Sequence, residues 1–504
     1  MDLLFNMSLN QPILVIGATG YVGKRLILRL LERGYKVRAG ARSIDQLNQF
    51  LPKDSRLAFI SMDALNRDSL KQACNDCGTV YYLVHSMKPG EKHFEETDRK
   101  AAENMVWAAE AAGVNRLIYL AGLGEDSKDL SKHLKSRREV ETILKSGKVP
   151  ATVLRAAMII GSGSVSFEIL RYLVERLPIM VTPRWVSTKC QPIAIRNVLE
   201  YLVSCLEVPE TAGETFDIGA DEVLTYRRLM EIYAEEAKLT KRFVIPVPVL
   251  TPRLSSYWIH LVTPIHASLA RPLAEGLRNK VVCRENRIRE LIPQRLLNAK
   301  EAIQLALGEF QNQLLEIQEE SVLLPPEWSA PGDPSWAGGT RFEDKRTVVL
   351  KATSDQVWRP IQRIGGKTGW YYADWLWQLR GFLDWLVGGV GMRKGRTHSR
   401  ELNEGDAIDF WRVEKVELKK RLLLHAEMKL PGAAVLDFQI RFIDDETTVL
   451  SQTARFIPRG LMGIIYWYVA APLHHLVFGG MLRGISMAIE RHRVTQHENL
   501  ESPV

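Results

Sequence analysis

Two basic side chains, His133 and Arg137, lie four residues apart in the segment SKHLKSRREVE (131–141). Residues at this spacing share one face of a helix, so both side chains can point at the same site. An imidazole has an ordinary pKa of ~6.5, whereas a guanidinium keeps a fixed charge and lowers the pKa of a neighbouring imidazole. The pair predicts either proton transfer or ligand binding without chemistry. The alternative is a surface helix with solvated charges, Arg138 and Glu141 among them.

A glycine-rich turn lies near the start of the sequence, where IGATGYVG places Gly17, Gly20 and Gly23 between an apolar strand (12–17) and a helix (21–34). A tight turn needs residues without a Cβ, and so does a close approach between the backbone and a pyrophosphate. The free N–H groups at the start of the following helix then hold the phosphates. Strand, turn and helix together predict a dinucleotide-binding turn.

The first third of the sequence alternates between strands and helices. Such alternation predicts a parallel sheet with both faces covered, which is the doubly wound α/β Rossmann class. The helix that carries His133 and Arg137 follows the fifth strand, so it is expected beside the dinucleotide site. The expected strands are 12–17, 35–41, 57–64, 79–86, 116–122 and 151–160, and the expected helices before 131 are 21–34, 68–77 and 95–114.

The end of the second strand selects the cofactor. An acidic residue there would bind the ribose hydroxyls of NAD, but this sequence has Arg42. A guanidinium suits a 2′-phosphate through paired hydrogen bonds, so NADP(H) is favoured over NAD(H). Arg38 is expected inside the strand. Asp63, after the third strand, is expected to accept from the adenine amino group or to cap the following helix.

Several motifs resemble the atypical, extended short-chain dehydrogenase/reductases, including NmrA-like NAD(P)-binding proteins. They are GATGYVG, the Asp63 position, YYLVHS, RLIYLAGLG, TVLRAAMIIGSGS and QPIAIRNVLEYLV. The resemblance covers about 10–320 and implies the following cofactor contacts. Gly17, Thr19, Gly20, Tyr21, Val22 and Gly23 would hold the phosphates, Arg42 the 2′-phosphate, Asp63 and Ala64 the adenine, and Val84, His85, Ser86 and Arg137 the nicotinamide ribose.

The family's catalytic positions are changed in this sequence. Its Ser or Thr is Ala121–Gly122, its Tyr is His133 and its Lys is Arg137. In the family, the tyrosine gives a proton to the carbonyl as hydride arrives. His133 is the candidate acid here, and Arg137 would hold the ribose. Whether the site still transfers hydride stays open.

The composition changes after residues 321–340, a Pro-, Gly- and Ser-rich linker. Beyond it we expect a strand (346–352), an aromatic helix (369–389) and a long helix (460–493). Between these helices, apolar residues alternate along 422–429 and 434–442, which predicts an antiparallel sheet with one buried and one solvated face. Segments such as FIPRGLMGIIYWYVAAPLHH resemble bacterial two-part proteins with a C-terminal domain of uncharacterised function. That domain (341–495) is similar to START-like (SRPBCC-type), α+β helix-grip domains, in which a curved antiparallel sheet wraps a long helix and leaves a ligand cavity.

Two apolar stretches raise the question of a membrane. The segment 461–482 is long enough to span a bilayer, but a buried or interfacial helix with peripheral membrane contact is favoured, because it contains Pro472, His474 and His475. The stretch 256–280 is expected to shape a substrate pocket or to touch a bilayer. Seven of the 12 tryptophans lie beyond residue 345, where they form core, line a ligand cavity or meet a membrane interface.

The composition excludes some classes. The net charge of +8 is spread along 504 residues, so nucleic-acid binding is not expected. Cys74 and Cys77 form a lone CxxC without further ligands, and His474 and His475 point to different helix faces, so no metal site is expected. No signal peptide is expected either, which favours a cytoplasmic protein with ordinary thiols.

The sequence therefore predicts a two-domain NADP(H)-binding oxidoreductase that acts on a hydrophobic small molecule, held partly by the C-terminal domain. Two alternatives stay open. One is a non-catalytic NADP(H)-binding redox sensor or assembly factor. The other is a membrane-associated protein that handles lipid or quinone. The substrate and the oligomeric state do not follow from the sequence.

Overall fold

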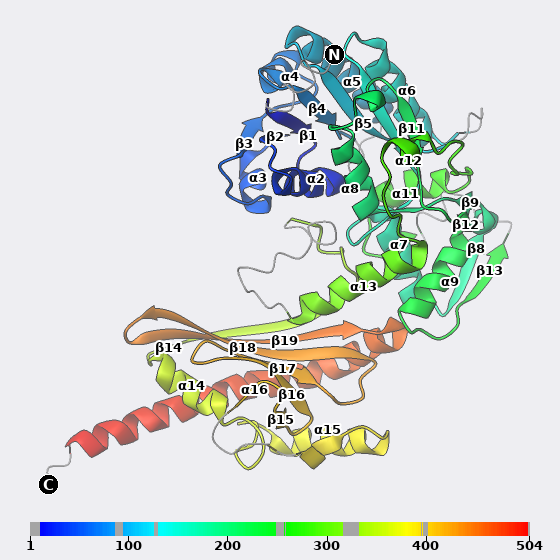
Figure 1. The fold of residues 1–504 in the computed structure, drawn as a ribbon. Coiled ribbons are helices and arrows are strands. Elements are labelled where there is room, and N and C mark those ends of the chain that lie inside the picture. Colours follow the sequence, from blue (N-terminus) through cyan, green and yellow to red (C-terminus); the bar gives the residue numbers. More distant parts are fainter. Residues whose placement is uncertain are drawn as a thin grey trace. The chain divides into compact units, whose positions relative to one another are not determined.

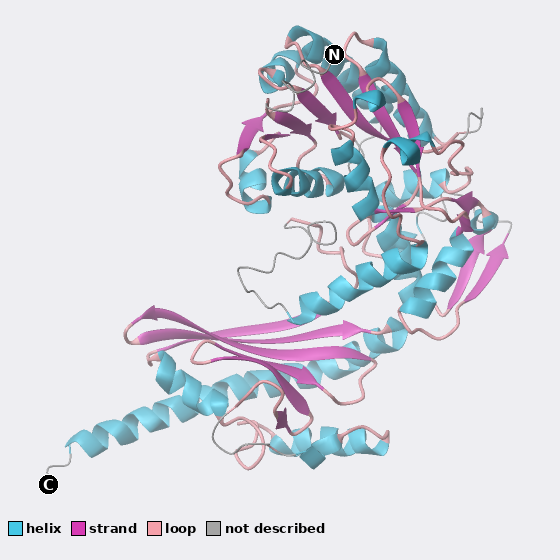
Figure 2. Cartoon of the chain, viewed as in Figure 1, coloured by secondary structure: helices cyan, strands magenta, loops and turns pink. Residues whose placement is uncertain are grey.

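The computed structural model describes residues 11–85, 94–124, 130–247, 257, 259–315, 332–394, 396 and 402–501. The chain divides into two compact units. The first comprises Met1–Phe310 with Gln318–Gly339, and the second comprises Gln311–Ile317 with Thr340–Val504. Figure 1 labels the elements, and Figure 2 distinguishes helices from strands.

The first unit is built on a parallel sheet of seven strands in the order β3-β2-β1-β4-β5-β6-β11. This order confirms the predicted Rossmann class, in which ligands bind beyond the carboxyl ends of the strands where the order reverses, beside β1 and β4. The strands are β1 (Ile13–Ile16), β2 (Val37–Ala41), β3 (Leu57–Ser61), β4 (Thr79–Tyr82), β5 (Arg116–Gly122), β6 (Ala151–Ala156) and β11 (Thr215–Ile218).

Helices cover both faces of this sheet because successive side chains of the buried strands point in opposite directions. Ile13 and Val15 of β1 belong to a core formed with one set of helices, and Leu14 and Ile16 belong to a core formed with the other. The first set is α2 (Tyr21–Glu32), α3 (Ile44–Phe50) and α8 (Ile195–Ser204); the second is α4 (Arg67–Cys74), α5 (Phe94–Ala111) and α6 (Lys132–Ser146).

The chain beyond β6 forms the wall of a cavity described below. The expected strand 151–160 is interrupted after Ala156, and its last part is a separate strand, β7, which pairs with β10. The elements of this region are β7 (Ile159–Ile160), α7 (Val165–Arg176), β8 (Ile179–Pro183), β9 (Lys189–Cys190), β10 (Ile193–Ala194), β12 (Leu224–Thr225), α9 (Tyr226–Glu236), β13 (Phe243–Val247), α11 (Ala267–Gly276), α12 (Arg287–Leu291) and α13 (Ala299–Leu315).

The second unit has an antiparallel sheet in the order β14-β19-β18-β17-β16-β15, with the long helix α16 packed against β14 and β19. Its aromatic core includes Trp370, Trp377 and Trp411, all buried. The elements are β14 (Phe342–Leu350), α14 (Ser354–Gln362), α15 (Asp374–Leu386), β15 (Ala407–Ile408), β16 (Trp411–Glu417), β17 (Arg421–Ala426), β18 (Gly432–Asp444), β19 (Thr447–Pro458) and α16 (Gly460–Glu501).

The antiparallel strands confirm the expected element types, but the half-buried pattern holds only in part. Leu422 and Leu424 point into the core under α16, as predicted. Leu423 points to the opposite face and is nevertheless fully buried, where it packs with Val435 and Ile457. The prediction of a solvated second face was therefore wrong at this position.

Candidate functional site

The glycine turn has the geometry that a dinucleotide phosphate requires. Gly17 has φ +87°, which L side chains rarely adopt, and a Cβ on Gly23 would overlap the carbonyl oxygen of Gly17. The helix α2 begins after Gly20, and no side chain caps its first turn. Its N-terminal N–H groups and helix dipole therefore face the carboxyl end of the sheet as an anion site. The residues present fit a dinucleotide.

Tyr21 contributes to this turn through its backbone alone. Its side chain turns inward, with the guanidinium of Arg25 4.1 Å from the ring centre, and a Cβ on Gly161 would overlap its hydroxyl oxygen. Burial raises the pKa of Tyr21 well above its usual value. The predicted phosphate contact is therefore restricted to the N–H group of Tyr21, because the phenol is buried against Gly161 and points away from the exposed turn.

Residues at the ends of β2 and β3 occupy the expected positions. Arg42 directly follows β2 and is exposed, so its guanidinium is free to meet a ligand phosphate. Arg38 lies within β2 and donates to the carbonyl oxygens of Ala73 and Asn75, as its strand position predicts. Asp63 is exposed and accepts from Leu65 N at 3.0 Å. The predicted capping role was wrong, because Asn66 caps α4 instead.

The other predicted cofactor residues lie around the same sheet edge. Thr19 and Val22 are partly exposed in the glycine turn and the first turn of α2. Ala64 accepts from Asn104 Nδ2 through its carbonyl oxygen at 3.1 Å. Val84 packs against the core after β4. Ser86 lies outside the described residues, so its predicted ribose contact stays a prediction.

His85 is held by a carboxylate that no motif in the sequence indicated. Its Nδ1 lies 3.1 Å from Oδ2 of Asp98 on α5, and the hydroxyl of Ser136 on α6 donates to the same oxygen at 3.3 Å. Among the described residues, Nε2 of His85 has no hydrogen-bond partner. Because Asp98 fixes the ring through Nδ1, Nε2 is the atom left for a ligand.

His133 and Arg137 lie on the first two turns of α6, as their spacing predicts. The rings of His133 and His85 are 5.0 Å apart between centres, and Arg137 donates to the hydroxyl of Tyr119 at 3.2 Å. Nδ1 of His133 is buried without a hydrogen-bond partner in the part of the chain that the structure describes. The site thus places two imidazoles and one guanidinium beside the ends of β4 and β5.

Both imidazoles are neutral at pH 7. Burial and, secondly, Arg137 lower the pKa of His85 to about 4, although Asp98 acts in the opposite direction. Burial, His85 and Arg137 lower the pKa of His133 well below its usual value. A neutral imidazole is a poor acid, so His133 can act at this pH as a hydrogen-bonding group toward a polar ligand atom.

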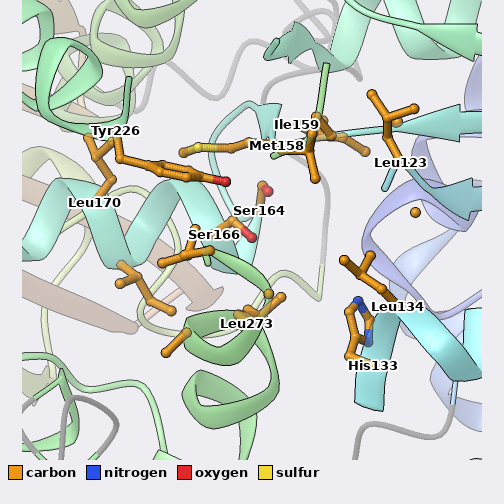
Figure 3. A pocket seen from close by; sticks show the side chains of 18 of the residues that line it. Leu123, His133, Leu134, Met158, Ile159, Ser164, Ser166, Leu170, Tyr226 and Leu273 are labelled. Carbon is orange, nitrogen blue, oxygen red and sulfur yellow. The ribbon is translucent and has the colours of Figure 1, made fainter. Parts of the chain in front are cut away.

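These residues line a cavity of about 300 Å³ whose remaining wall is mostly apolar. Figure 3 shows His133 on one side of the pocket and Leu170 with Tyr226 on the other. The polar residues at the cavity are His85, His133, Arg137, Ser164, Ser166, Trp185 and Tyr226. Ile259, Leu273 and Leu277 also contribute, which supports the pocket-forming role expected for part of 256–280. The volume suits a small molecule with few polar atoms.

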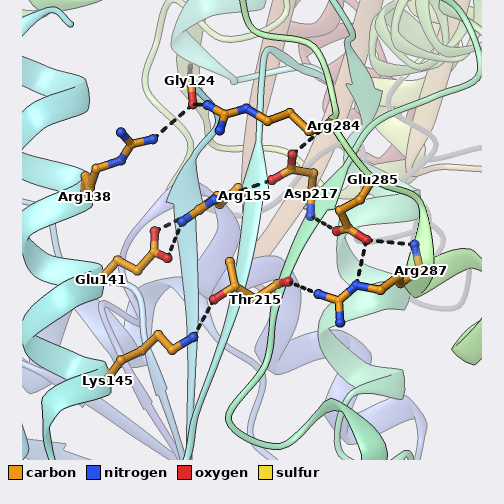
Figure 4. A network of polar contacts seen from close by, with 10 residues as sticks. All are labelled: Gly124, Arg138, Glu141, Lys145, Arg155, Thr215, Asp217, Arg284, Glu285 and Arg287. Carbon is orange, nitrogen blue, oxygen red and sulfur yellow. Dashed lines mark hydrogen bonds and ion pairs between the residues drawn. The ribbon is translucent and has the colours of Figure 1, made fainter. Parts of the chain in front are cut away.

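A network of ion pairs positions α6 against the sheet (Figure 4). Glu141 accepts from Arg155 of β6 at 2.6 and 2.9 Å, and Asp217 of β11 lies 3.9 Å from the same guanidinium. Arg138 and Arg284 both donate to the carbonyl oxygen of Gly124. The alternative of a surface helix with solvated charges was wrong, because Glu141 is only 6% exposed.

The lone CxxC contains two buried, unreactive thiols. Cys74 ends α4 and Cys77 precedes β4. Burial raises the pKa of Cys74 to about 12 and that of Cys77 to about 11. Neither forms a nucleophilic thiolate at neutral pH. Among the described residues, there is no group of three or more His, Cys, Asp or Glu that could hold a metal ion.

Comparison with protein families identifies the cofactor class of the first unit. Residues 17–171 match a family model described as NAD(P)H-binding. Residues 17–171 are an NAD(P)H-binding domain. The matched range contains the glycine turn, Arg42, His85 and α6, which confirms the predicted nicotinamide cofactor and leaves the choice between NAD(H) and NADP(H) open. Residues 336–481 match a second model, described as a protein of unknown function (DUF2867).

The chain spans less than two thirds of the length of two relatives found by sequence. A mitochondrial protein of Arabidopsis thaliana, NADH dehydrogenase [ubiquinone] 1 alpha subcomplex subunit 9, is 24% identical over 47% of this chain and 60% of its own. A photosystem II assembly factor of Trieres chinensis is 24% identical over 42% of this chain and 65% of its own. A solved nucleoside-diphosphate-sugar epimerase of Staphylococcus aureus covers 58% of this chain and 99% of its own, with 16% identity and a TM-score of 0.48.

Proposed function

We propose that the first unit is an oxidoreductase that uses NADP(H) on an apolar small molecule. The observation that carries the proposal is the cavity of about 300 Å³, which extends from Val22 in the first turn of α2 to His133 and Arg137 on α6. The nicotinamide end of a cofactor held at the glycine turn would meet this cavity. When bound, the reduced cofactor supplies a hydride.

The roles of the side chains follow from their positions and charges. Arg42 binds the 2′-phosphate, which favours NADP(H), and Arg137 holds the nicotinamide ribose through its guanidinium. His133 donates a hydrogen bond from its neutral ring to an oxygen atom of the substrate. This hydrogen bond polarises the bond between that oxygen and the carbon that accepts the hydride. Asp98 keeps His85 in one orientation, and the apolar wall excludes water from the reacting atoms.

The second unit would add to substrate handling. Its antiparallel sheet and long C-terminal helix support our proposal of a START-like, helix-grip domain that holds part of a hydrophobic ligand.

The relatives include a subunit of a mitochondrial NADH dehydrogenase and a photosystem assembly factor. For this chain, a cytoplasmic location with membrane contact stays a prediction.

A second candidate function is a non-catalytic NADP(H)-binding sensor or assembly factor. Two observations favour it. All three positions of the family's catalytic triad are changed, to Ala121–Gly122, His133 and Arg137. The neutral imidazoles also lack the readily released proton of an acid with a pKa near 7.

A substrate panel separates these functions. NADPH oxidation is followed by absorbance with quinones and aldehydes of increasing apolar surface. We expect turnover with at least one apolar acceptor, and mass spectrometry of co-purifying molecules would guide the choice of acceptors. NADPH binding without any turnover would favour the sensor, and an absence of dinucleotide binding would contradict both candidates.

A further inference from the structure

The first part of α16 forms an unusually apolar and exposed surface within the second unit. The range Gly460–Arg491 is long and apolar enough to cross a membrane, yet only 17% of its apolar window is buried. The segment 460–482 contains no Asp, Glu, Lys or Arg. Arg459 and Arg483, which flank this segment, are both exposed. Cationic side chains at both ends of an uncharged segment are typical of helices that meet a lipid headgroup layer.

Helix α15 adds exposed aromatic side chains to the same unit. Trp375 is 65% exposed, Phe382 53% and Trp385 44%, whereas Tyr468 and Val469 on α16 are 66% and 73% exposed. Large aromatic residues with a polar atom are enriched at the interface between water and lipid. So much exposed apolar area is uncommon on a protein surface that meets only water.

Helix α15 has two acidic residues. Asp374, its first residue, is exposed and accepts from the backbone N–H of Trp370 at 2.8 Å, whereas Asp384 lies near the C-terminal end of the helix. The side chain of Asp384 is fully buried and accepts from the backbone N–H groups of Gly391 and Lys429 at 2.9 and 2.7 Å. Arg380, on the same helix, is partly exposed. Arg380, Arg459 and Arg483 outnumber the exposed Asp374 on α15 and at the ends of the apolar segment, so the net charge around the surface is cationic, which suits anionic headgroups rather than a cationic partner.

A second cavity, of about 370 Å³, opens through this surface. It lies within the second unit and is lined by aromatic residues that include Trp377, Trp411 and Phe456. Leu383 of α15 and Leu473 of α16 line the cavity and are 47% and 52% exposed, so they form part of its mouth. A ligand that enters through this mouth therefore crosses the exposed apolar surface of α15 and α16 and does not cross a polar part of the protein surface.

The packing of α16 indicates that this helix lies on a membrane and does not cross it. Met481, Ile485 and Ile489 are buried in the core against the sheet. A bilayer-spanning position of the apolar segment would remove some of these side chains from that core. The exposed half of α16 and α15 can instead rest in the headgroup region while the sheet keeps its core.

We infer that α15 and the first half of α16 dock the second unit onto an anionic lipid bilayer, and that its cavity takes one lipid chain from that bilayer. The inference does not depend on the cofactor chemistry of the first unit. A second copy of the chain is the competing occupant of the surface. The uncharged segment with cationic ends favours lipid, because self-association would bring like charges together.

Vesicle flotation tests the docking. The full-length protein is mixed with vesicles of equal parts phosphatidylcholine and phosphatidylglycerol. We expect the wild type to float, and the double variant Val469→Glu/Leu473→Glu to bind at least tenfold more weakly. Leu418→Glu is the matched control, since Leu418 is 66% exposed in the turn between β16 and β17, and it should float like the wild type.

Two results would overturn the docking. The first is that the wild type does not float, or that the double variant floats equally well. The second is a dimer in light scattering that the same double variant converts to a monomer, because a second copy would then occupy the surface. Unchanged circular dichroism and thermal unfolding confirm that each variant is folded.

Energy transfer tests the cavity. cis-Parinaric acid, a fluorescent fatty acid, accepts energy from nearby tryptophans, and Trp377, Trp411 and Trp467 line the cavity. We expect saturable transfer in the wild type. Ala470→Phe and Ala434→Phe should each weaken this binding at least tenfold while flotation persists, because both alanines line the cavity. Wild-type affinity for the probe in both variants would contradict the cavity assignment.

Discussion

Asp98 Oδ2 lies 3.1 Å from Nδ1 of His85, and both groups are largely buried, with side chains 4% and 13% exposed. The contact joins α5 to the loop that follows β4, at the edge of the sheet where the cofactor is expected. The hydroxyl of Ser136 adds α6 to the same carboxylate. One acidic residue therefore orients a cofactor-side imidazole and ties it to the helix that carries His133.

Replacing Asp98 should weaken the fold. Asp98→Asn leaves His85 and Ser136 with a weaker, uncharged acceptor, and we expect the free energy of unfolding to fall by about 1–3 kcal/mol. Urea denaturation measures this difference. Glu96→Gln, an exposed position on the same helix, should change the value by less than about 0.5 kcal/mol. Equal effects of the two substitutions would contradict the assigned role of Asp98.

His85 should make stability depend on pH. Its pKa is lowered to about 4 in the folded chain, below the ordinary value of ~6.5, so the unfolded chain binds the proton more readily. The contribution is fully present above pH ~6.5 and is lost as the pH falls toward 4, with a total of about 3 kcal/mol. Unfolding measured from pH 7 to 4 should show a smaller decline for His85→Asn than for the wild type. Identical slopes would contradict the burial of a neutral imidazole.

Local signals explain which parts of the cofactor site could be predicted. The turn from Gly17 to Gly23 and the position of Arg42 follow from one strand–turn–helix–strand pattern, because each part is adjacent in the sequence. The Asp98–His85 contact depends on how α5 packs, so spacing along the chain does not reveal it. A weaker signal was present, since Asp98 lies in helical phase with the buried Ala102 and Met105.

The same reasoning explains the wrong prediction for Glu141. The surface-helix alternative placed Glu141 among solvated charges together with Arg138. Glu141 lies seven residues after the buried Leu134, which places both on the inner face of α6. Its partner, Arg155, is the penultimate residue of β6 and lies within the strand predicted at 151–160. Only one part of the cavity wall, within 256–280, could be predicted, because the rest is built by several segments that are distant in sequence.

The Glu141–Arg155 pair should stabilise α6. Glu141→Gln removes the negative charge that Arg155 meets at 2.6 and 2.9 Å, while Asp217 lies farther from the same guanidinium, at 3.9 Å, and we expect a loss of about 2 kcal/mol in unfolding free energy. Glu139→Gln is the matched control on the same helix. Its ion pair with Arg99 is exposed, so the loss should stay below about 1 kcal/mol. If the free energy of unfolding fell as much for Glu139→Gln as for Glu141→Gln, burial would not determine how much each ion pair stabilises the fold.

Arg42 should determine the preference between the two dinucleotides. Arg42→Ala removes a charged donor from the 2′-phosphate, so we expect the Kd for NADPH to rise at least about tenfold. The Kd for NADH should change less than about threefold. Calorimetric titration measures both constants, with the exposed Lys53→Ala as the charge-matched control. Equal losses for NADPH and NADH would contradict the assignment of the 2′-phosphate to Arg42.

The most direct test of the proposed activity is a comparison of His133→Ala with the wild type, using an apolar acceptor that supports NADPH oxidation. The neutral imidazole is proposed to polarise the acceptor and not to bind the cofactor. We therefore predict that kcat falls about 100-fold while the Kd for NADPH stays within about threefold. Full turnover by His133→Ala would contradict the proposed role of this residue at the cavity.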